Sequence, residues 1–199
     1  MIESKARKRI ITELLRLTHP PHFTYERIQY DLSHLQAAKF CLTIQAHGSN
    51  PELEIFIYLE FTNHCYTTGT PKVADTPHDL VDHNNWPRWF DPDRHETSLI
   101  LPNFVRQLHK KKCFFTRNQN WLIIELQGES GSSIPFYLVF SAWKIKDQDN
   151  GLHLRIVSAY KKTEGENAPH RGSNLDRTSF AMLARKTLAG ESVKRYRRR

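Results

Sequence analysis

Short segments in which apolar and polar side chains alternate follow one another through residues 113–161. Phe136, Leu138 and Phe140, for example, alternate with their neighbours, which is the period of a strand with one buried face. The turn-forming sequences RNQN, GESGSS and KDQDNG separate the segments. We therefore predict an antiparallel β-meander with strands at Cys113–Thr116, Trp121–Leu126, Pro135–Ile145 and Leu152–Lys161.

The first residues have a helical period instead. Residues 3–17 place Ile10, Leu14 and Leu17 on one face, which predicts an amphipathic helix. After the THPPH break, Thr24 is suited to cap a second helix, in which Tyr25, Ile28, Leu32 and Leu35 recur at helical spacing. An alternating pattern at 40–45 and 53–61, joined by the turn HGSNP, predicts an antiparallel β pair.

The remaining segments complete an α+β architecture. Residues 66–97 contain four prolines and little periodicity, so we expect an irregular loop there. A short helix follows from Pro102 and buries Phe104, Val105 and Leu108. Residues 178–188 predict a short helix or an edge segment ended by Gly190. We expect a single domain over 1–190, made of a helical and hairpin part (1–97) and a meander part (98–190), with a basic tail at 191–199.

Positive charge is gathered in blocks. Residues 1–9, 105–117 and 185–199 are each net positive, whereas 10–104 are net negative and 118–184 are neutral, within a total of +8. Such blocks favour a polyanion as partner, RNA or DNA, although charge runs are often only solvated surface. We expect phosphate contacts from Arg94, Arg106, Lys110, Lys111, Lys112, Arg117, Lys161, Lys194, Arg195 and Arg197.

The cysteines and the apolar content indicate the compartment. Cys41, Cys65 and Cys113 are odd in number and widely spaced, which argues against a disulfide framework. No apolar run approaches the roughly 20 residues that cross a bilayer. We expect a cytoplasmic protein with no membrane partner.

Eleven histidines raise the question of a metal site. The best cluster is His78, Asp79, Asp82 and His83, but no group has the paired spacing of a zinc site. We predict no metal and no cofactor, and keep a metal-assisted hydrolase that uses residues 78–83 as a distant alternative.

The strand Gly151–Thr163, with the sequence GLHLRIVSAYKKT, carries a resemblance to known proteins. Through Arg155, Ser158, Ala159 and Tyr160, residues 98–190 resemble the broad group of barnase, EndoU, colicin and RelE-type ribonuclease domains of bacterial toxins and phage-linked proteins. The resemblance implies cleavage of RNA without a metal ion. The chain departs from the group in residues 1–97 and in having no evident His–Glu pair on the meander.

RNA cleavage of this kind needs a proton acceptor, a proton donor and a cation for the phosphate. His109, Arg155, Ser158 and Tyr160 are the candidate catalytic residues, although a structural role is open for each. We therefore expect a bacterial or phage-related protein that acts on RNA, as a toxin-like endoribonuclease with a protein inhibitor or regulatory partner. The alternative is a non-enzymatic nucleic-acid-binding or regulatory protein that also engages a protein partner.

Overall fold

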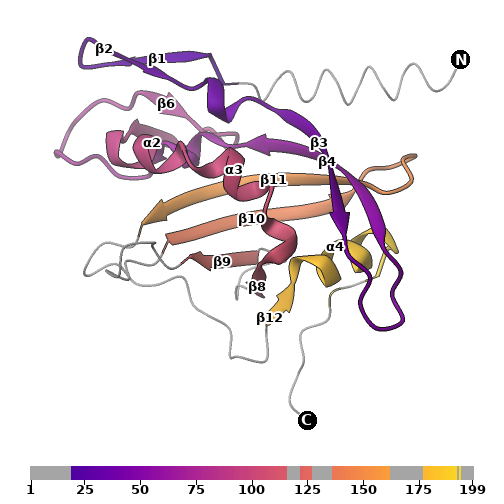
Figure 1. Cartoon of the computed structure of the whole chain (residues 1–199). Helices are drawn as coiled ribbons and strands as arrows, with labels where there is room; N and C mark the ends of the chain where they lie inside the picture. The colour runs from indigo at the N-terminus through magenta and orange to yellow at the C-terminus, as the bar shows by residue number, and fades with distance from the viewer. Residues whose placement is uncertain (1–18, 116–121, 127–135, 162–176, 192, 194–199) are drawn as a thin grey trace, which may run out of the picture.

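The computed structural model describes residues 19–115, 122–126, 136–161, 177–191 and 193. Its largest unit is a seven-stranded mixed sheet (Figure 1). In spatial order the strands are β12 (Arg177–Ser179), β8 (Lys112–Phe115), β9 (Leu122–Leu126), β10 (Phe136–Lys144), β11 (Gly151–Lys161), β4 (Leu53–Phe61) and β3 (Ala38–Ile44).

The predicted meander is confirmed. β8 pairs with β9, β9 with β10 and β10 with β11, and each pair is antiparallel. One irregularity interrupts the last pair: Val139 lies opposite Ser158 and Phe140 opposite Ile156, so Val157 is an extra residue. A β-bulge of this kind bends the strand that contains the extra residue, here the C-terminal half of β11.

The predicted β pair is also confirmed, because β3 and β4 are antiparallel neighbours. Its place in the sheet was not predicted. β4 lies parallel to β11, with Ile57 beside Leu152 and Glu60 beside Arg155. Strands from the first and second halves of the sequence therefore share one sheet.

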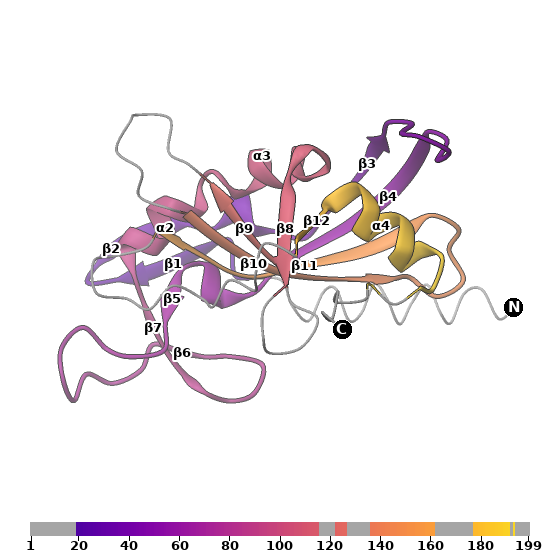
Figure 2. The ribbon, with the colours of Figure 1, turned by 90° about the horizontal axis from the view of Figure 1, so that it is seen from below.

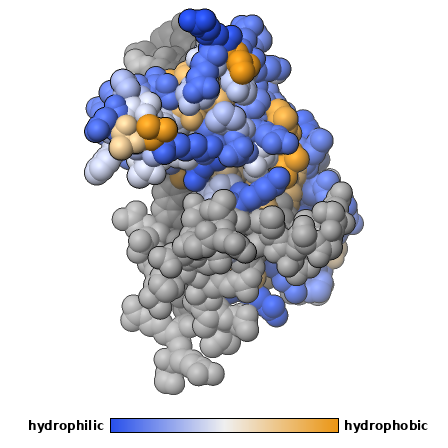
Figure 3. Space-filling view, turned by 90° about the vertical axis from the view of Figure 1, so that its left-hand side faces the viewer, coloured by the Kyte–Doolittle hydropathy of each residue, from blue (hydrophilic) through white to orange (hydrophobic). Residues whose placement is uncertain are grey.

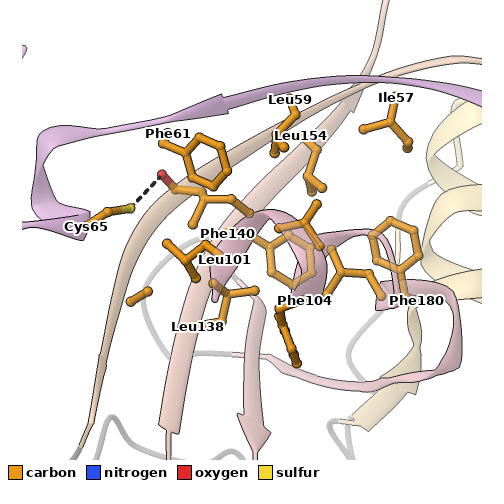
Figure 4. Close-up of a cluster of buried hydrophobic side chains, with 14 of the residues drawn as sticks. Ile57, Leu59, Phe61, Cys65, Leu101, Phe104, Leu138, Phe140, Leu154 and Phe180 are labelled. Atoms are coloured by element: carbon orange, nitrogen blue, oxygen red, sulfur yellow. Dashed lines mark hydrogen bonds between the residues drawn. The ribbon is translucent and has the colours of Figure 1, made fainter. Parts of the chain in front are cut away.

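One face of this sheet forms the core. α3 (Leu101–Val105), the 3-10 helix η3 (Leu108–Lys110) and α4 (Phe180–Leu188) supply side chains that are buried with those of the strands. Figure 2 shows α3 and α4 on the same side of the sheet. In Figure 4, Leu101 and Phe104 lie beside Phe140 and Leu138, and Phe180 approaches from α4. Each fully buried aliphatic or aromatic side chain contributes roughly 1.5–3 kcal/mol to folding.

The predicted helix after Thr24 is wrong. The segment forms a hairpin of β1 (His22–Tyr25) and β2 (Ile28–Asp31), followed by the 3-10 helix η1 (Ser33–Leu35). Glu26 and Arg27 have φ of 49° and 67°, which is the turn conformation that closes a two-residue hairpin. The other predicted N-terminal helix, residues 3–17, lies outside the described residues.

Aromatic packing explains why the hairpin wins over the helix. Phe23, Tyr25 and Tyr30 surround Phe90, with ring centroids 5.0, 5.2 and 4.6 Å from it. A tertiary contact of this size outweighs helix propensity, which is worth less than about 1 kcal/mol per residue. The helical spacing of Leu32 and Leu35 has a local cause, since both are buried at the single turn of η1.

Residues 66–97 contain more regular structure than the sequence predicted. The 3-10 helix η2 (Asn63–Cys65) leads into a three-stranded sheet of β5 (Thr67–Thr68), β7 (Pro87–Phe90) and β6 (Leu80–Val81). α2 (Pro92–Ser98) follows. Asp91 caps this helix by accepting hydrogen bonds from the amides of Asp93 and Arg94, and Pro92 occupies its first turn.

The C-terminal prediction is confirmed in both of its forms. β12 is an edge strand and α4 is a short helix that follows it directly. Ser179 caps α4 by accepting a hydrogen bond from Met182 N, and Gly190 follows with φ of 71°. Among the described residues visible from the left of Figure 1, most are hydrophilic and the hydrophobic ones form small separate groups (Figure 3). None of the helices in the described part of the chain has the length and apolar composition to cross a membrane.

Candidate functional site

The sheet face opposite the core carries polar side chains in register. Along β11, Leu152, Leu154 and Ile156 point into the core, so His153 and Arg155 point to the other face. Ala159 returns to the core beyond the bulge. The bulge residue therefore leaves His153, Arg155, Ser158 and Tyr160 on one side of the sheet.

Glu60, Arg155 and His153 form a compact group on this face. Glu60 is 2% exposed and accepts a hydrogen bond from Nε of Arg155 through Oε1. His153 Nε2 lies 3.1 Å from Glu60 Oε2, close enough for an ion pair but not aligned for a hydrogen bond. The parallel pairing of β4 with β11 creates the group, because it sets Glu60 beside Arg155. We call these three side chains the Glu60 trio.

The surroundings keep Glu60 ionised. Burial alone raises the pKa of a carboxyl, but His153 and Arg155 together outweigh that effect, so the pKa of Glu60 lies below its usual value. Trp143 covers the trio from β10. Its ring centroid is 4.2 Å from that of His153, and the Arg155 guanidinium lies 5.3 Å from the indole.

A pocket of about 360 Å³ adjoins the trio and is lined by both Glu60 and Arg155. His19 and Tyr66 form another part of its wall, with His19 Nδ1 3.2 Å from the Tyr66 hydroxyl. Burial lowers the pKa of His19, which favours its neutral form. The remaining lining residues are Pro20, Phe61, Thr62, Asn63, Leu80, Val81, Asp82 and His83.

Three of the sequence-predicted residues meet at the end of β11. Arg94 reaches across from α2 and lies 4.9 Å from the Tyr160 ring. Its Nη1 donates to the carbonyl of His64 at 3.2 Å and approaches Ser158 Oγ at 3.5 Å. The ring centroid of Tyr160 is also 5.6 Å from that of Tyr137, the residue opposite it on β10. Arg155 lies on the same face of the same strand.

His109 is not brought to these residues. It belongs to η3, which packs with α4 on the core side of the sheet, and its Nδ1 is buried without a hydrogen-bond partner among the described residues. Arg155, by contrast, faces away from the core. The structure therefore does not bring His109 together with Arg155.

The predicted basic residues are divided among several places. Arg106 lies over the ring of Phe40 and Lys111 over the ring of Phe104, at 4.8 and 5.4 Å. Lys110, Lys112 and Lys161 are exposed. Arg155 is neutralised by Glu60. Arg117, Lys194, Arg195 and Arg197 lie outside the described residues.

The cluster considered for a metal has other partners. Asp79 accepts a hydrogen bond from Phe90 N, and Asp82 accepts hydrogen bonds from the amides of Asn84 and Trp86. Asp82 also lies 3.0 Å from His64 Nε2. Among the described residues, no group of three or more His, Cys, Asp or Glu side chains is arranged to hold a metal ion.

Sequence reasoning missed two members of the trio. Glu60 follows the regular alternation of its strand, so nothing local singles it out, whereas His153 precedes Arg155 by two residues, the spacing of one strand face. The spacing of His153 was available from the sequence. Glu60 needed the parallel pairing of two strands that are far apart in sequence, which no local pattern reveals.

The fold and the trio define an α+β protein with a carboxylate, a guanidinium and an imidazole grouped on the polar face of a mixed sheet. Residues 22–188 match the YjaZ family, and the chain belongs to this family. The match runs from the β1–β2 hairpin to the end of α4 and so includes every strand of the large sheet. No match is found among curated proteins or among solved structures.

Proposed function

We propose that this protein cleaves RNA without a metal cofactor, and that the Glu60 trio carries the reaction. The observation that supports the proposal is an ionised carboxylate held between an imidazole and a guanidinium beside a pocket. These are the three groups that transesterification of RNA requires. The His–Glu pair that the ribonuclease resemblance lacked in the sequence thus has a counterpart in His153 and Glu60.

Each side chain has a definite role in this proposal. Glu60 takes the proton from the ribose 2′-hydroxyl, whose oxygen then forms a bond to phosphorus. His153 gives a proton to the 5′-oxygen as its bond to phosphorus breaks, leaving a 2′,3′-cyclic phosphate and a free 5′-hydroxyl. Arg155 donates hydrogen bonds to the phosphoryl oxygens, where negative charge develops.

The charge of the chain supports RNA as the substrate. Acidic and basic side chains nearly balance within the described residues, so the excess positive charge lies in segments beyond them, among which is the tail with Lys194, Arg195 and Arg197. Such segments attract a polyanion without reading its sequence. The resemblance to toxin ribonucleases extends the proposal to a bacterial or phage-related toxin that works in the cytoplasm.

A binding protein without catalytic activity is the competing proposal, and the exposed Lys110 and Lys112 favour it. The two proposals differ in one measurement. Labelled RNA is incubated with the purified protein in EDTA, and the fragments are examined for cyclic-phosphate ends. Cleavage supports the ribonuclease, whereas salt-sensitive binding without cleavage supports the binding protein.

Variants then test the assignment of roles. Glu60→Gln keeps the shape of the side chain but removes its charge, and we expect a loss of cleavage of about 10²–10⁴-fold. Glu54→Gln is the matched control, because Glu54 lies on the same strand and face but is exposed. Equal cleavage by the Glu60→Gln variant and the wild-type protein would exclude Glu60 as the base.

A further inference from the structure

We propose that four side chains in one row across the sheet form a stacking platform for single-stranded nucleic acid. They are Trp143, His153, Tyr58 and Lys39, and we call them the cross-strand row. The inference rests on the proposed function and deepens it, since it names the strand form of the substrate.

The strand register places the four side chains in line. Trp143 of β10 is opposite His153 of β11, His153 is beside Tyr58 of β4, and Tyr58 is opposite Lys39 of β3. These four strands are neighbours in the sheet (Figure 1). With a spacing of about 4.8 Å between strands, the row extends roughly 14 Å.

All four side chains lie on the face opposite the core. Ile57 and Leu59 flank Tyr58 and are buried, as are Leu152 and Leu154 on either side of His153. Trp143 is 37% exposed, and Phe56, which precedes Tyr58 on the same face, is 48% exposed. Large aromatic side chains in strands are usually buried, so the exposure of Trp143 and Phe56 on this face favours a ligand with flat apolar faces.

Cations already lie against these aromatic rings. Lys39 Nζ is 4.8 Å from the centre of the Tyr58 ring, and the Arg155 guanidinium is 5.3 Å from the Trp143 ring. A nucleic acid presents a base and a phosphate at each step, and a ring with a neighbouring cation matches both. The row therefore complements a nucleotide chain better than it complements an apolar peptide or a lipid.

The geometry favours a single strand over a duplex. Bases in a duplex are stacked on one another, so their faces are covered, whereas an unpaired base can stack on the exposed indole of Trp143 or the half-buried phenol ring of Tyr58. The row also adjoins the proposed catalytic residues. Two residues along each strand, the next row on the same face contains Ser141, Arg155 and Glu60. A base on Trp143 would place its backbone next to Arg155.

Binding to DNA tests the platform separately from catalysis, because deoxyribose has no 2′-hydroxyl to attack the phosphate. A fluorescein-labelled oligodeoxythymidine of about 12 nucleotides is titrated with the full chain. We expect Trp143→Ala and Tyr58→Leu each to weaken binding about tenfold, within a range of about 5- to 150-fold per lost stacking contact. Trp143→Phe, which keeps an aromatic ring, should bind within about threefold of the wild-type protein.

Trp86→Ala provides the matched control. Trp86 is 68% exposed on the turn between β6 and β7, and we expect no change in affinity when it is replaced. A labelled duplex of the same length should bind independently of Trp143. Thermal melting of each variant checks that the fold is intact. If Trp143→Ala does not fold, Tyr58→Leu still tests the loss of stacking, with Trp143→Phe as the variant that keeps it.

The outcomes separate the platform from the ribonuclease. Wild-type affinity in both the Trp143→Ala and the Tyr58→Leu variants would overturn the platform, even if the protein cleaves RNA. Weakened single-strand binding in these variants, together with no cleavage by the wild-type protein, would retain the platform and remove the ribonuclease.

Discussion

Glu60 and Arg155 are ion-paired across the junction at which β4 joins β11 in parallel. The pair thus connects a strand from the first half of the sequence with one from the second. Glu60 is almost fully buried, while the Arg155 side chain is 30% exposed and lies at the pocket. A buried charge of this kind is tolerated because its partner remains in place.

Replacing Arg155 by alanine should therefore lower the stability of the protein. The change leaves Glu60 buried with only His153 beside it, and we expect a loss of about 3 kcal/mol in the free energy of unfolding. Urea unfolding followed by tryptophan fluorescence measures it. Arg106→Ala is the control, because Arg106 is exposed and lies over Phe40. Equal midpoints for the wild-type protein and Arg155→Ala would mean that the ion pair contributes no stability.

The same pair predicts a dependence of stability on pH. The pKa of Glu60 is lower in the folded protein than its ordinary value, so the folded state binds this proton less readily than the unfolded chain does. The contribution of Glu60 is then fully present above the ordinary pKa of a glutamate and is lost as pH falls through the lowered pKa.

Comparison with Glu60→Gln isolates this contribution, because other carboxyls affect both proteins alike. We expect the wild-type protein to be the more stable at about pH 7, and the difference in melting temperature to shrink steadily towards about pH 3. A difference that stays constant over this range would show that Glu60 has the same pKa in both states.

Local sequence patterns were sufficient to predict part of this fold. The alternation around Phe136–Phe140 identified β10, and Gly190 marked the end of α4. The hairpin at β1 and β2 was missed because its strands are held by Phe90, more than fifty residues away. A periodicity argument sees only neighbours along the chain, so it assigned Tyr25 and Ile28 to a helix.

In the candidate site, too, residues within one strand were predicted and residues brought together by long-range pairing were not. Arg155, Ser158 and Tyr160 were predicted from one strand, and the structure keeps them on one face because of the bulge at Val157. Glu60 was not predicted, since its role depends on the pairing of β4 with β11. His109 was predicted from its place just before the meander, but the side of the sheet on which it lies depends on the path of the chain through α3 and η3.

The three cysteines should differ in reactivity. Cys41 is exposed on β3, whereas Cys65 and Cys113 are buried. Burial raises the pKa of Cys65 to about 12 and also raises that of Cys113, so neither forms a thiolate near neutral pH. We expect a maleimide reagent to label Cys41 alone in the folded protein, as read by mass spectrometry of peptides. In urea all three should be labelled, and rapid labelling of Cys65 without denaturant would contradict the packing of η2 against β11.

Arg94 has two possible roles, and one variant distinguishes them. The sequence suggested a phosphate contact, but in the structure the guanidinium is occupied by the carbonyl of His64, the hydroxyl of Ser158 and the ring of Tyr160. We therefore expect Arg94→Gln to lower the free energy of unfolding by about 1.5–3 kcal/mol, the range for hydrogen bonds to a charged group. The salt dependence of RNA binding should stay the same, because no phosphate contact is lost. Unchanged stability together with a shallower salt dependence would instead assign Arg94 to the nucleic acid, since removing one phosphate contact reduces that slope by about one.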